Sequence, residues 1–328
     1  MQMGHPIIGD LVLVGGGHAQ ISVLKAFAMK KVPGLRLTLV TNSSRTPYSG
    51  MLPGYVEGVW QDEDLHIDLR HLAAAANARM IVATVTGIDA DLKQIYFNDR
   101  PELTFDVLSI NIGGQPSLAM IDGAAKHAIP VKPIAKFQTQ FERLISLKSQ
   151  QKPAQNLPRT LPKKLAVIGG GAAGCELALA LITRWKAETG TAPELSLITD
   201  KDRLMPQMAP KAAKLVDKTL RARGADILYC NRVTSIKGNT LTMSSGKTLG
   251  FDACFLVTQV TAPSWLADTG LDLDPHGFVK VTPTLQSTSH PYIFAAGDIA
   301  AVSQSPRPKA GVFAVRAGKI LAHNLRRY

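Results

Sequence analysis

The feature that most constrains this chain is a local pattern that occurs twice, near residue 11 and again near residue 165. Each copy has a short apolar run, a cluster of glycines, an apolar spacing typical of a helix, and a second apolar run. The paired runs are residues 11–14 and 35–40 in the first copy, and 165–168 and 195–198 in the second. Fully apolar runs are expected of parallel strands covered on both faces. Each copy therefore predicts a strand–turn–helix–strand unit of about 30 residues.

The second copy has the complete spacing of a phosphate-binding turn, G-x-G-x-x-G. Glycines between a strand and a helix leave room for a pyrophosphate, and the helix N-terminus supplies N–H donors and a favourable dipole. Two such patterns in matching contexts are much stronger evidence than one. We therefore expect a dinucleotide to contact Gly169, Gly171, Ala172, Ala173 and Gly174.

The first copy departs from this spacing at its third glycine. Gln20 occupies that position, which implies either a looser contact between helix and strand or a polar role beside the cofactor. His18 is either a phosphate donor or a solvated loop residue. The expected cofactor contacts in this turn are Gly15, Gly16, Gly17, His18 and Ala19.

The residues that follow each returning strand bear on the choice of nucleotide. Thr41 and Asn42 follow the first such strand, and the Asn42 amide can hydrogen-bond a ribose. Asp200 follows the second strand and suits a free 2′-hydroxyl, whereas Lys201 and Arg203 suit a 2′-phosphate. The sequence leaves NADH against NADPH open.

The rest of the chain alternates between strand and helix patterns, which predicts an α/β architecture with doubly wound parallel sheets. A helix is expected at residues 134–148, followed by a Pro-containing linker up to residue 164. Further strands are expected at residues 79–85, 94–97, 107–112, 225–229, 240–243 and 253–258.

Composition narrows the class of protein. The chain has 328 residues, which suffices for two domains, with 45% hydrophobic and 19% charged residues. The net charge of +12 suits a phosphate-bearing cofactor, but Lys and Arg are dispersed without interleaved aromatics. Nucleic acid is therefore not an expected partner. No secretory signal and no apolar run of about 18 residues is present, so we expect a cytoplasmic protein without a transmembrane segment.

Three isolated cysteines exclude several kinds of chemistry. Cys175, Cys230 and Cys254 form no CxxC or CxxxxC pair, which argues against a disulfide framework and a sequence-local redox dithiol. The histidines show no metal-ligand spacing, so no metal is expected.

A third element carries a resemblance to a known family. Residues 292–298 (YIFAAGD) resemble the second flavin signature of the two-dinucleotide-domain FAD oxidoreductases. Residues 106–113 (DVLSINIG) resemble the strand that closes the first FAD-binding unit of that family. Residues 252–260 (DACFLVTQV) resemble the second such strand, with Gln259 in place of the usual glycine.

Three further segments narrow the resemblance: TPYSGMLP at 46–53, PVKPI at 130–134 and PRPKAG at 306–311. Together they are similar to the flavoprotein module found N-terminal to selenophosphate synthetase (selenide, water dikinase), a relative of type-II NADH dehydrogenases. Such relatives continue into a C-terminal domain used for dimerisation or membrane attachment, whereas the printed chain stops at Tyr328. A homodimer, membrane-surface contact and a longer or fused protein are therefore left open.

The resemblance implies two Rossmann-like domains, one inserted in the other. Residues 1–120 and 285–328 would form the FAD domain, and residues 121–284 the NAD(P) domain. Thr46 and Pro47 would lie beside the flavin, and Asp298 would bind its ribityl chain. The remaining expected cofactor contacts are Thr41, Asn42, Val85, Gly113, Gly297, Lys309, Ala310 and Gly311, of which the last three would approach the pyrimidine end of the flavin.

The expected function is an FAD-dependent NAD(P)H oxidoreductase that passes hydride from nicotinamide to flavin. Glu176 is the candidate catalytic side chain, either fixing the nicotinamide or serving only as a first-turn carboxylate that the helix dipole stabilises. Because no redox cysteine pair exists, a small electron acceptor is expected, quinone-like or a selenium or sulfur compound. The alternative is a non-catalytic flavin- or dinucleotide-binding sensor or scaffold module. A third hypothesis, which rests only on charge, is a protein that binds nucleic acid or a membrane surface.

Overall fold

The computed structural model describes residues 6–146, 161–257 and 260–328. The contacts divide the chain into two units. Unit 1 comprises Met1–Gly50, His66–Gln115 and Val260–Tyr328, and unit 2 comprises Met51–Leu65 and Pro116–Gln259.

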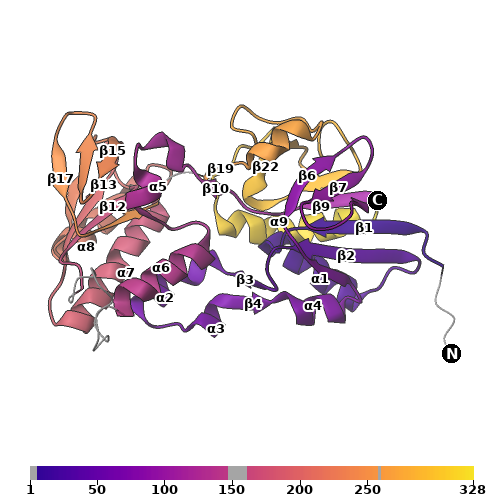
Figure 1. The fold of residues 1–328 in the computed structure, drawn as a ribbon, viewed down its shortest axis with the longest axis horizontal. Helices are drawn as coiled ribbons and strands as arrows, with labels where there is room; N and C mark the ends of the chain where they lie inside the picture. The colour runs from indigo at the N-terminus through magenta and orange to yellow at the C-terminus, as the bar shows by residue number, and fades with distance from the viewer. Residues whose placement is uncertain (1–5, 147–160, 258–259) are drawn as a thin grey trace. The chain divides into compact units, whose positions relative to one another are not determined.

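Unit 1 is built on a five-stranded parallel sheet whose first strands are those predicted by the first copy of the repeat. The order across the sheet is β21 (Ile293–Ala295), β9 (Val107–Ile110), β1 (Gly9–Val14), β2 (Leu35–Thr41) and β5 (Arg79–Val82). Helix α1 (His18–Met29) packs against α9 (Gly311–Leu325) and α4 (Leu69–Ala75) (Figure 1). The central strand is almost fully buried from Leu11 to Val14, which explains its uninterrupted apolar run.

Unit 2 repeats this design. Its parallel sheet has the order β11 (Ile129–Pro130), β18 (Ala253–Leu256), β12 (Lys164–Ile168), β13 (Glu194–Ile198) and β14 (Asp226–Leu228). Helix α7 (Ala172–Thr189) packs against α2 (Leu52–Glu57) and α8 (Pro210–Ala222) (Figure 1). The core of the unit also takes in Phe137 and Phe141 from α6 (Ile134–Ser146).

The correspondence extends to a three-stranded antiparallel insertion in each unit. In unit 1 it consists of β6 (Val85–Asp89), β7 (Gln94–Phe97) and β8 (Leu103–Thr104). In unit 2 it consists of β15 (Val233–Lys237), β16 (Thr240–Met243) and β17 (Thr248–Gly250). The predicted α/β class with repeated parallel sheets is therefore confirmed.

The shorter elements connect these layers. They are β3 (Arg45–Pro47), η1 (Ser49–Met51), α3 (Asp62–Leu65), β4 (His66–Asp68), β10 (Gln115–Pro116), η2 (Leu118–Met120), α5 (Ala124–His127), β19 (Val260–Thr261), η3 (Ser264–Asp268), β20 (Val279–Val281), η4 (Gly297–Ile299) and β22 (Ala300–Val302). Among the described residues, no helix is long and apolar enough to cross a membrane.

The structure differs from the sequence predictions in several places. The single strand predicted at 79–85 is wrong: β5 ends at Val82 and β6 starts at Val85, because the chain leaves the parallel sheet there while its apolar pattern continues. The predicted linker at 149–160, the end of the predicted helix at 147–148, and Gln259 lie outside the described residues.

The units also differ from the predicted domain boundaries. Residues 260–284 group with unit 1, where β20 pairs with β22 and η3 contacts β6. Met51–Leu65 groups with unit 2, because α2 packs on α7. Both segments are held by contacts distant in sequence, which local patterns do not reveal.

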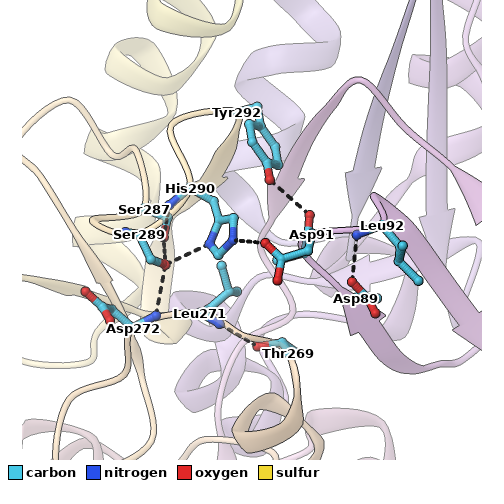
Figure 2. Close-up of polar contacts among 11 residues, drawn as sticks. Asp89, Asp91, Leu92, Thr269, Leu271, Asp272, Ser287, Ser289, His290 and Tyr292 are labelled. Atoms are coloured by element: carbon cyan, nitrogen blue, oxygen red, sulfur yellow. Dashed lines mark hydrogen bonds and ion pairs between the residues drawn. The ribbon is translucent and has the colours of Figure 1, made fainter.

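A polar cluster fastens the β6–β7 turn of unit 1 to the segment that leads into β21 (Figure 2). His290 Nε2 lies 3.2 Å from Asp91 Oδ1, and its Nδ1 lies 2.9 Å from Ser289 Oγ. Ser289 Oγ also accepts the backbone N–H of Asp272 at 3.0 Å. A serine, a histidine and an aspartate meet here, but their bonds have a structural role. They hold the segment that leads through β21 to Gly297 and Asp298 against the neighbouring loops.

Candidate functional site

The first glycine turn joins β1 to α1, and backbone atoms of two other segments lie close to it. Gly15 has φ of +96°, a conformation that favours glycine. Its N–H donates to Val40 O at 2.7 Å, and an added Cβ would lie 2.4 Å from Asn111 O. No residue with a side chain fits there without movement of the backbone.

Asn111 makes hydrogen bonds to this turn through both its side chain and its backbone carbonyl. The sequence predictions did not select this residue. Its side chain is buried, with Oδ1 accepting the Ala19 N–H at 3.0 Å and Nδ2 donating to Ala296 O at 2.6 Å. Its backbone carbonyl accepts the Gly17 N–H at 3.1 Å. The only signal in the sequence was a polar residue at the end of an apolar strand, in DVLSINIG.

Gln20, at the third glycine position, is fully buried and paired within the protein. Its Nε2 donates to the Ser109 carbonyl at 2.9 Å and contacts the Ser109 hydroxyl at 3.1 Å. Ser109 belongs to β9, the strand beside β1. The Gln20 amide is therefore held by β9, which offers a small side chain and a carbonyl where the amide needs them.

Segments far apart in sequence meet around this turn. An added Cβ on Gly16 would lie 3.2 Å from Thr41 Oγ1 and 3.7 Å from Thr46 Cβ. Pro47 follows Thr46 in β3, which pairs with β4. An added Cβ on Gly311 would lie 2.8 Å from Ser49 Oγ. Contacts thus link Gly16 to Thr46 and, separately, Ser49 to Gly311.

His18 carries an unsatisfied polar atom in this turn. Its Nε2 is buried and has no hydrogen-bond partner among the described residues, and its ring centroid lies 4.8 Å from that of Tyr48. Burial lowers the pKa of the imidazole, which favours its neutral form. An unpartnered buried polar atom is costly unless a ligand or water satisfies it. The turn therefore fits a bound polar group such as a dinucleotide.

The other predicted contacts of unit 1 occupy several positions. Asp298 is buried in η4, directly after Gly297, and Ala310 precedes the first residue of α9. Lys309 Nζ donates to Ala300 O at 2.6 Å and lies 3.9 Å from the Phe278 ring centroid, and burial lowers the pKa of this ammonium. Gly113 has open space around its Cα, Asn42 is exposed after β2, and Val85 begins β6.

The second glycine turn, in unit 2, is packed by backbone carbonyls at Gly169 and Gly174 and by the Thr199 and Leu204 side chains at Gly170. Gly169 has φ of +126°, and an added Cβ would lie 2.2 Å from Val257 O. An added Cβ on Gly174 would lie 1.9 Å from Gly169 O. Gly171, by contrast, has no heavy atom within 4 Å of an added Cβ. It precedes Ala172 and Ala173 at the exposed N-terminus of α7, so the turn is open where a phosphate would approach.

The polar side chains of unit 2 lie near this turn in sequence. Glu176 is in the first turns of α7; the residue is solvent exposed, yet partial burial of its carboxyl raises the pKa. Asp200 is exposed after β13, with Lys201 Nζ 3.2 Å from its Oδ2. Arg203 Nη2 donates to Pro206 O at 2.5 Å, so this guanidinium is engaged within its own loop.

The cysteines have no arrangement for redox chemistry. All three are free thiols; Cys175 and Cys254 are buried, and burial raises the pKa of each to about 12. They are therefore protonated at neutral pH, whereas the thiolate is the reactive form. Cys230 is exposed. No group of histidine, cysteine and acidic residues that could hold a metal is found in the described part of the chain.

Comparison with known proteins agrees with this geometry. The model of the pyridine nucleotide-disulphide oxidoreductase family matches residues 9–318. The NADH dehydrogenase-like protein YutJ of Bacillus subtilis is 20% identical over 302 residues, covering 90% of this chain and 78% of that protein. The ferredoxin–NAD(+) reductase component of the p-cumate 2,3-dioxygenase system of Pseudomonas putida is 27% identical over 312 residues, covering 93% and 70%.

A solved structure shows the same fold. The reduced CoADR-RHD of Bacillus anthracis superposes with a TM-score of 0.81 at 21% identity, and the match covers 100% of this chain but only 58% of that one. With a family model spanning nearly the whole sequence, the chain belongs to the pyridine nucleotide-disulphide oxidoreductase family, whose members are FAD-containing enzymes that use NAD(P)H.

Proposed function

We propose that this chain is an FAD-dependent NAD(P)H oxidoreductase in which unit 1 binds FAD, unit 2 binds NAD(P)H, and a small molecule receives the electrons. The observation that carries the assignment of unit 1 is the buried Nε2 of His18, which has no partner among the described residues, in a turn that Thr41 and Thr46 approach. The open, exposed turn at Gly171 supports the assignment of unit 2.

In unit 1, the free donors of the turn suit the pyrophosphate of FAD. Among the described residues, the backbone N–H groups of Gly16 and His18 have no protein partner, whereas those of Gly15, Gly17 and Ala19 are used within the protein. We assign the two free N–H groups and the His18 ring to the pyrophosphate. Thr41, Thr46 and Pro47 would line the same side of the turn as Gly16.

At the opposite end of the proposed FAD site, α9 supplies electrostatic stabilisation. The Lys309 ammonium is held by Ala300 O and the Phe278 ring, so it fixes the chain just before the helix begins at Gly311. The N-terminal dipole of α9 would then stabilise negative charge on the pyrimidine end of the flavin. When bound, the flavin supplies the hydride and electron-transfer chemistry; these residues orient it and set the field around it.

In unit 2, the proposed roles follow from the same physics. The N-terminus of α7 would bind the second pyrophosphate through the N–H groups of Gly171, Ala172 and Ala173. Glu176 would fix the nicotinamide, and Asp200 would accept from the ribose 2′-hydroxyl. Because Arg203 is engaged by Pro206 O, fewer cations are free for a 2′-phosphate, which favours NADH over NADPH.

The acceptor is proposed from the chemistry that the chain lacks. The sequence has no cysteine pair at redox spacing, and the buried thiols are protonated, so a protein dithiol is not the route by which electrons leave. A quinone-like molecule or a selenium or sulfur compound is proposed instead; the selenium option rests on the similarity to the module fused to selenophosphate synthetase. The Pseudomonas relative adds a ferredoxin-type protein as a further acceptor to test.

An anaerobic absorbance titration tests the proposal. Purified protein loaded with FAD should show a flavin spectrum that bleaches on addition of NADH, and more slowly with NADPH. A flavin spectrum that neither nucleotide bleaches would favour the non-catalytic sensor or scaffold module. A protein that binds no FAD would overturn the proposal. Oxidation of NADH with a soluble quinone, selenite or polysulfide as acceptor then separates the acceptor classes.

A further inference from the structure

We propose that Asn111 is a positioning residue that holds the first glycine turn and the Gly297–Asp298 turn in one arrangement for the bound flavin dinucleotide. The inference rests on the proposed function, because it takes unit 1 to be the FAD site. It goes beyond that proposal by assigning the geometry of the site to one buried amide on a strand that carries none of the predicted phosphate contacts.

The position of Asn111 follows from the sheet. It comes directly after β9, which lies between β1 and β21 in the strand order. Since all three strands are parallel, the turns that follow β1 and β21 flank the residue that follows β9. A side chain at this position can therefore contact both turns.

The chemistry of the bridge requires an amide. Oδ1 accepts the Ala19 N–H, and Nδ2 donates to Ala296 O. Asparagine carries both an acceptor and a donor, whereas ionised aspartate is acceptor-only and leucine has neither. The residue is buried, so loss of either bond would leave an unsatisfied backbone group without access to water.

Two glycines of the flavin signatures are explained by this side chain. An added Cβ on Gly17 would lie 2.3 Å from Asn111 Oδ1, and one on Gly297 would lie 2.5 Å from Nδ2. Neither distance is tolerated by real Cβ atoms. Gly17 and Gly297 therefore make room for the Asn111 amide, so the three residues form one interdependent unit.

Asn111 also decides which donors the turn presents. It uses the Gly17 N–H through its carbonyl and the Ala19 N–H through Oδ1. Of the turn's N–H groups, those of Gly16 and His18 are left for a ligand, together with the His18 ring. Loss of the amide would free the Ala19 N–H and release the turn from Ala296, which changes both the number and the direction of the donors.

The experiment compares wild type, Asn111→Asp and Asn111→Ser with Ser109→Ala as a matched control. Ser109 is fully buried on the same strand and bonds Gln20, but it contacts no residue of the Gly297 turn in the described hydrogen bonds. FAD affinity is measured by titrating apoprotein and following flavin fluorescence, and the Tm of each protein is measured with and without FAD.

All three variants are expected to lower the Tm of the apoprotein. Only the Asn111 variants should also weaken FAD binding, by about tenfold for Asn111→Ser and up to about a hundredfold for Asn111→Asp, with a matching loss of the FAD-induced rise in Tm. Asn111→Ser avoids the repulsion between a carboxylate and Ala296 O, so it keeps the test decisive if Asn111→Asp does not fold.

Wild-type FAD affinity separates the two claims. If wild type binds FAD and the Asn111 variants bind it equally well despite a lower apoprotein Tm, Asn111 is a structural residue only and the inference is overturned while the proposed function stands. If wild type itself does not bind FAD, the proposed function fails and the inference fails with it.

Discussion

The two glycine turns of this chain begin from nearly the same sequence but are packed in different ways. Both turns share one feature: a backbone carbonyl lies beside the first glycine, Asn111 O at Gly15 and Val257 O at Gly169. They differ at the later positions: in unit 1 the Asn111 amide lies beside Gly17 and Gln20 replaces the third glycine, whereas in unit 2 Gly171 is open and the Gly169 carbonyl lies beside Gly174. Both turns use a carbonyl that follows the neighbouring strand, but the unit 1 turn also depends on the side chains of Asn111 and Ser109.

This difference teaches that the third glycine is a packing device with substitutes. Gly174 permits α7 to approach the turn because it has no Cβ. In unit 1 Gln20 occupies this position, and its buried amide is bonded to the small Ser109 of β9. We therefore expect that a larger residue at Gly174 destabilises the second turn, and that a smaller residue at Gln20 destabilises the first.

The largest effect is expected from Gly174→Ala. The new Cβ would lie 1.9 Å from Gly169 O, which is backbone and cannot rotate away. We expect a loss of about 3 kcal/mol in the free energy of unfolding, by overpacking, and about a hundredfold weaker NADH binding because the phosphate donors shift. Urea unfolding and an NADH titration measure the two effects.

Gly171→Ala is the matched control in the same turn. Gly171 has open space around it and an ordinary φ of −74°, so the stability of this variant should equal that of wild type. Its NADH binding alone should weaken, because the methyl group occupies the approach of the phosphate. Equal destabilisation by both substitutions would contradict the conclusion that the Gly169 carbonyl fills the space beside Gly174 and that the space beside Gly171 is open.

Restoring the missing glycine by Gln20→Gly should destabilise unit 1 by about 2 kcal/mol. The change leaves a cavity, removes the hydrogen bonds from the Gln20 amide to Ser109, and places glycine inside a helix. Urea unfolding of Gln20→Gly, Gln20→Met, Ser109→Ala and the double variant Gln20→Met/Ser109→Ala gives the coupling between the two side chains. A Gln20→Gly variant as stable as wild type would mean that the turn accepts the usual glycine and that the Gln20 pairing is incidental.

His18→Phe should change stability and binding in opposite directions. The substitution removes the unpartnered Nε2 and keeps a ring beside Tyr48, so the apoprotein should gain about 1 kcal/mol. FAD affinity should fall by about tenfold, because the pyrophosphate loses a hydrogen bond. Tm of the apoprotein and a fluorescence titration with FAD measure the two; a variant that loses stability would show that His18 has a structural partner.

The smallest effect expected is a dependence of apoprotein stability on pH. The pKa of His18 is lowered in the folded state from an ordinary value of 6.5, so the neutral form is favoured by folding. The stability contribution is present above pH 6.5 and is lost as the pH falls from 6.5 toward the lower folded-state pKa. The Tm of wild type between pH 7.5 and pH 5.5, compared with that of His18→Phe, isolates this contribution; parallel curves would contradict it.

Local periodicity was enough to predict most of the framework. The apolar runs at 11–14 and 165–168 became the central strands β1 and β12, and the strands at 94–97 and 240–243 were predicted with their observed bounds. The strands of a parallel sheet that is covered on both faces are almost entirely apolar, so they can be recognised in the sequence. The break between Val82 and Val85 was missed because the apolar pattern does not change where the chain leaves the sheet.

The sequence by itself determined the repeat of the α/β unit, the two phosphate-type turns and the lack of a cysteine pair at redox spacing, since each of these is a matter of residue type and short spacing. Only the tertiary structure decided that Asn111 fills one turn, that Gln20 pairs with Ser109, that Lys309 is anchored to Ala300, and that His18 Nε2 has no partner in the described part of the chain. The first two are contacts between segments distant in sequence, the third joins residues nine positions apart, and the fourth is the absence of a contact. The physical reason is that a hydrogen bond depends on which groups parallel strands bring side by side, and strand order is settled by packing of the whole sheet rather than by the residues of one turn.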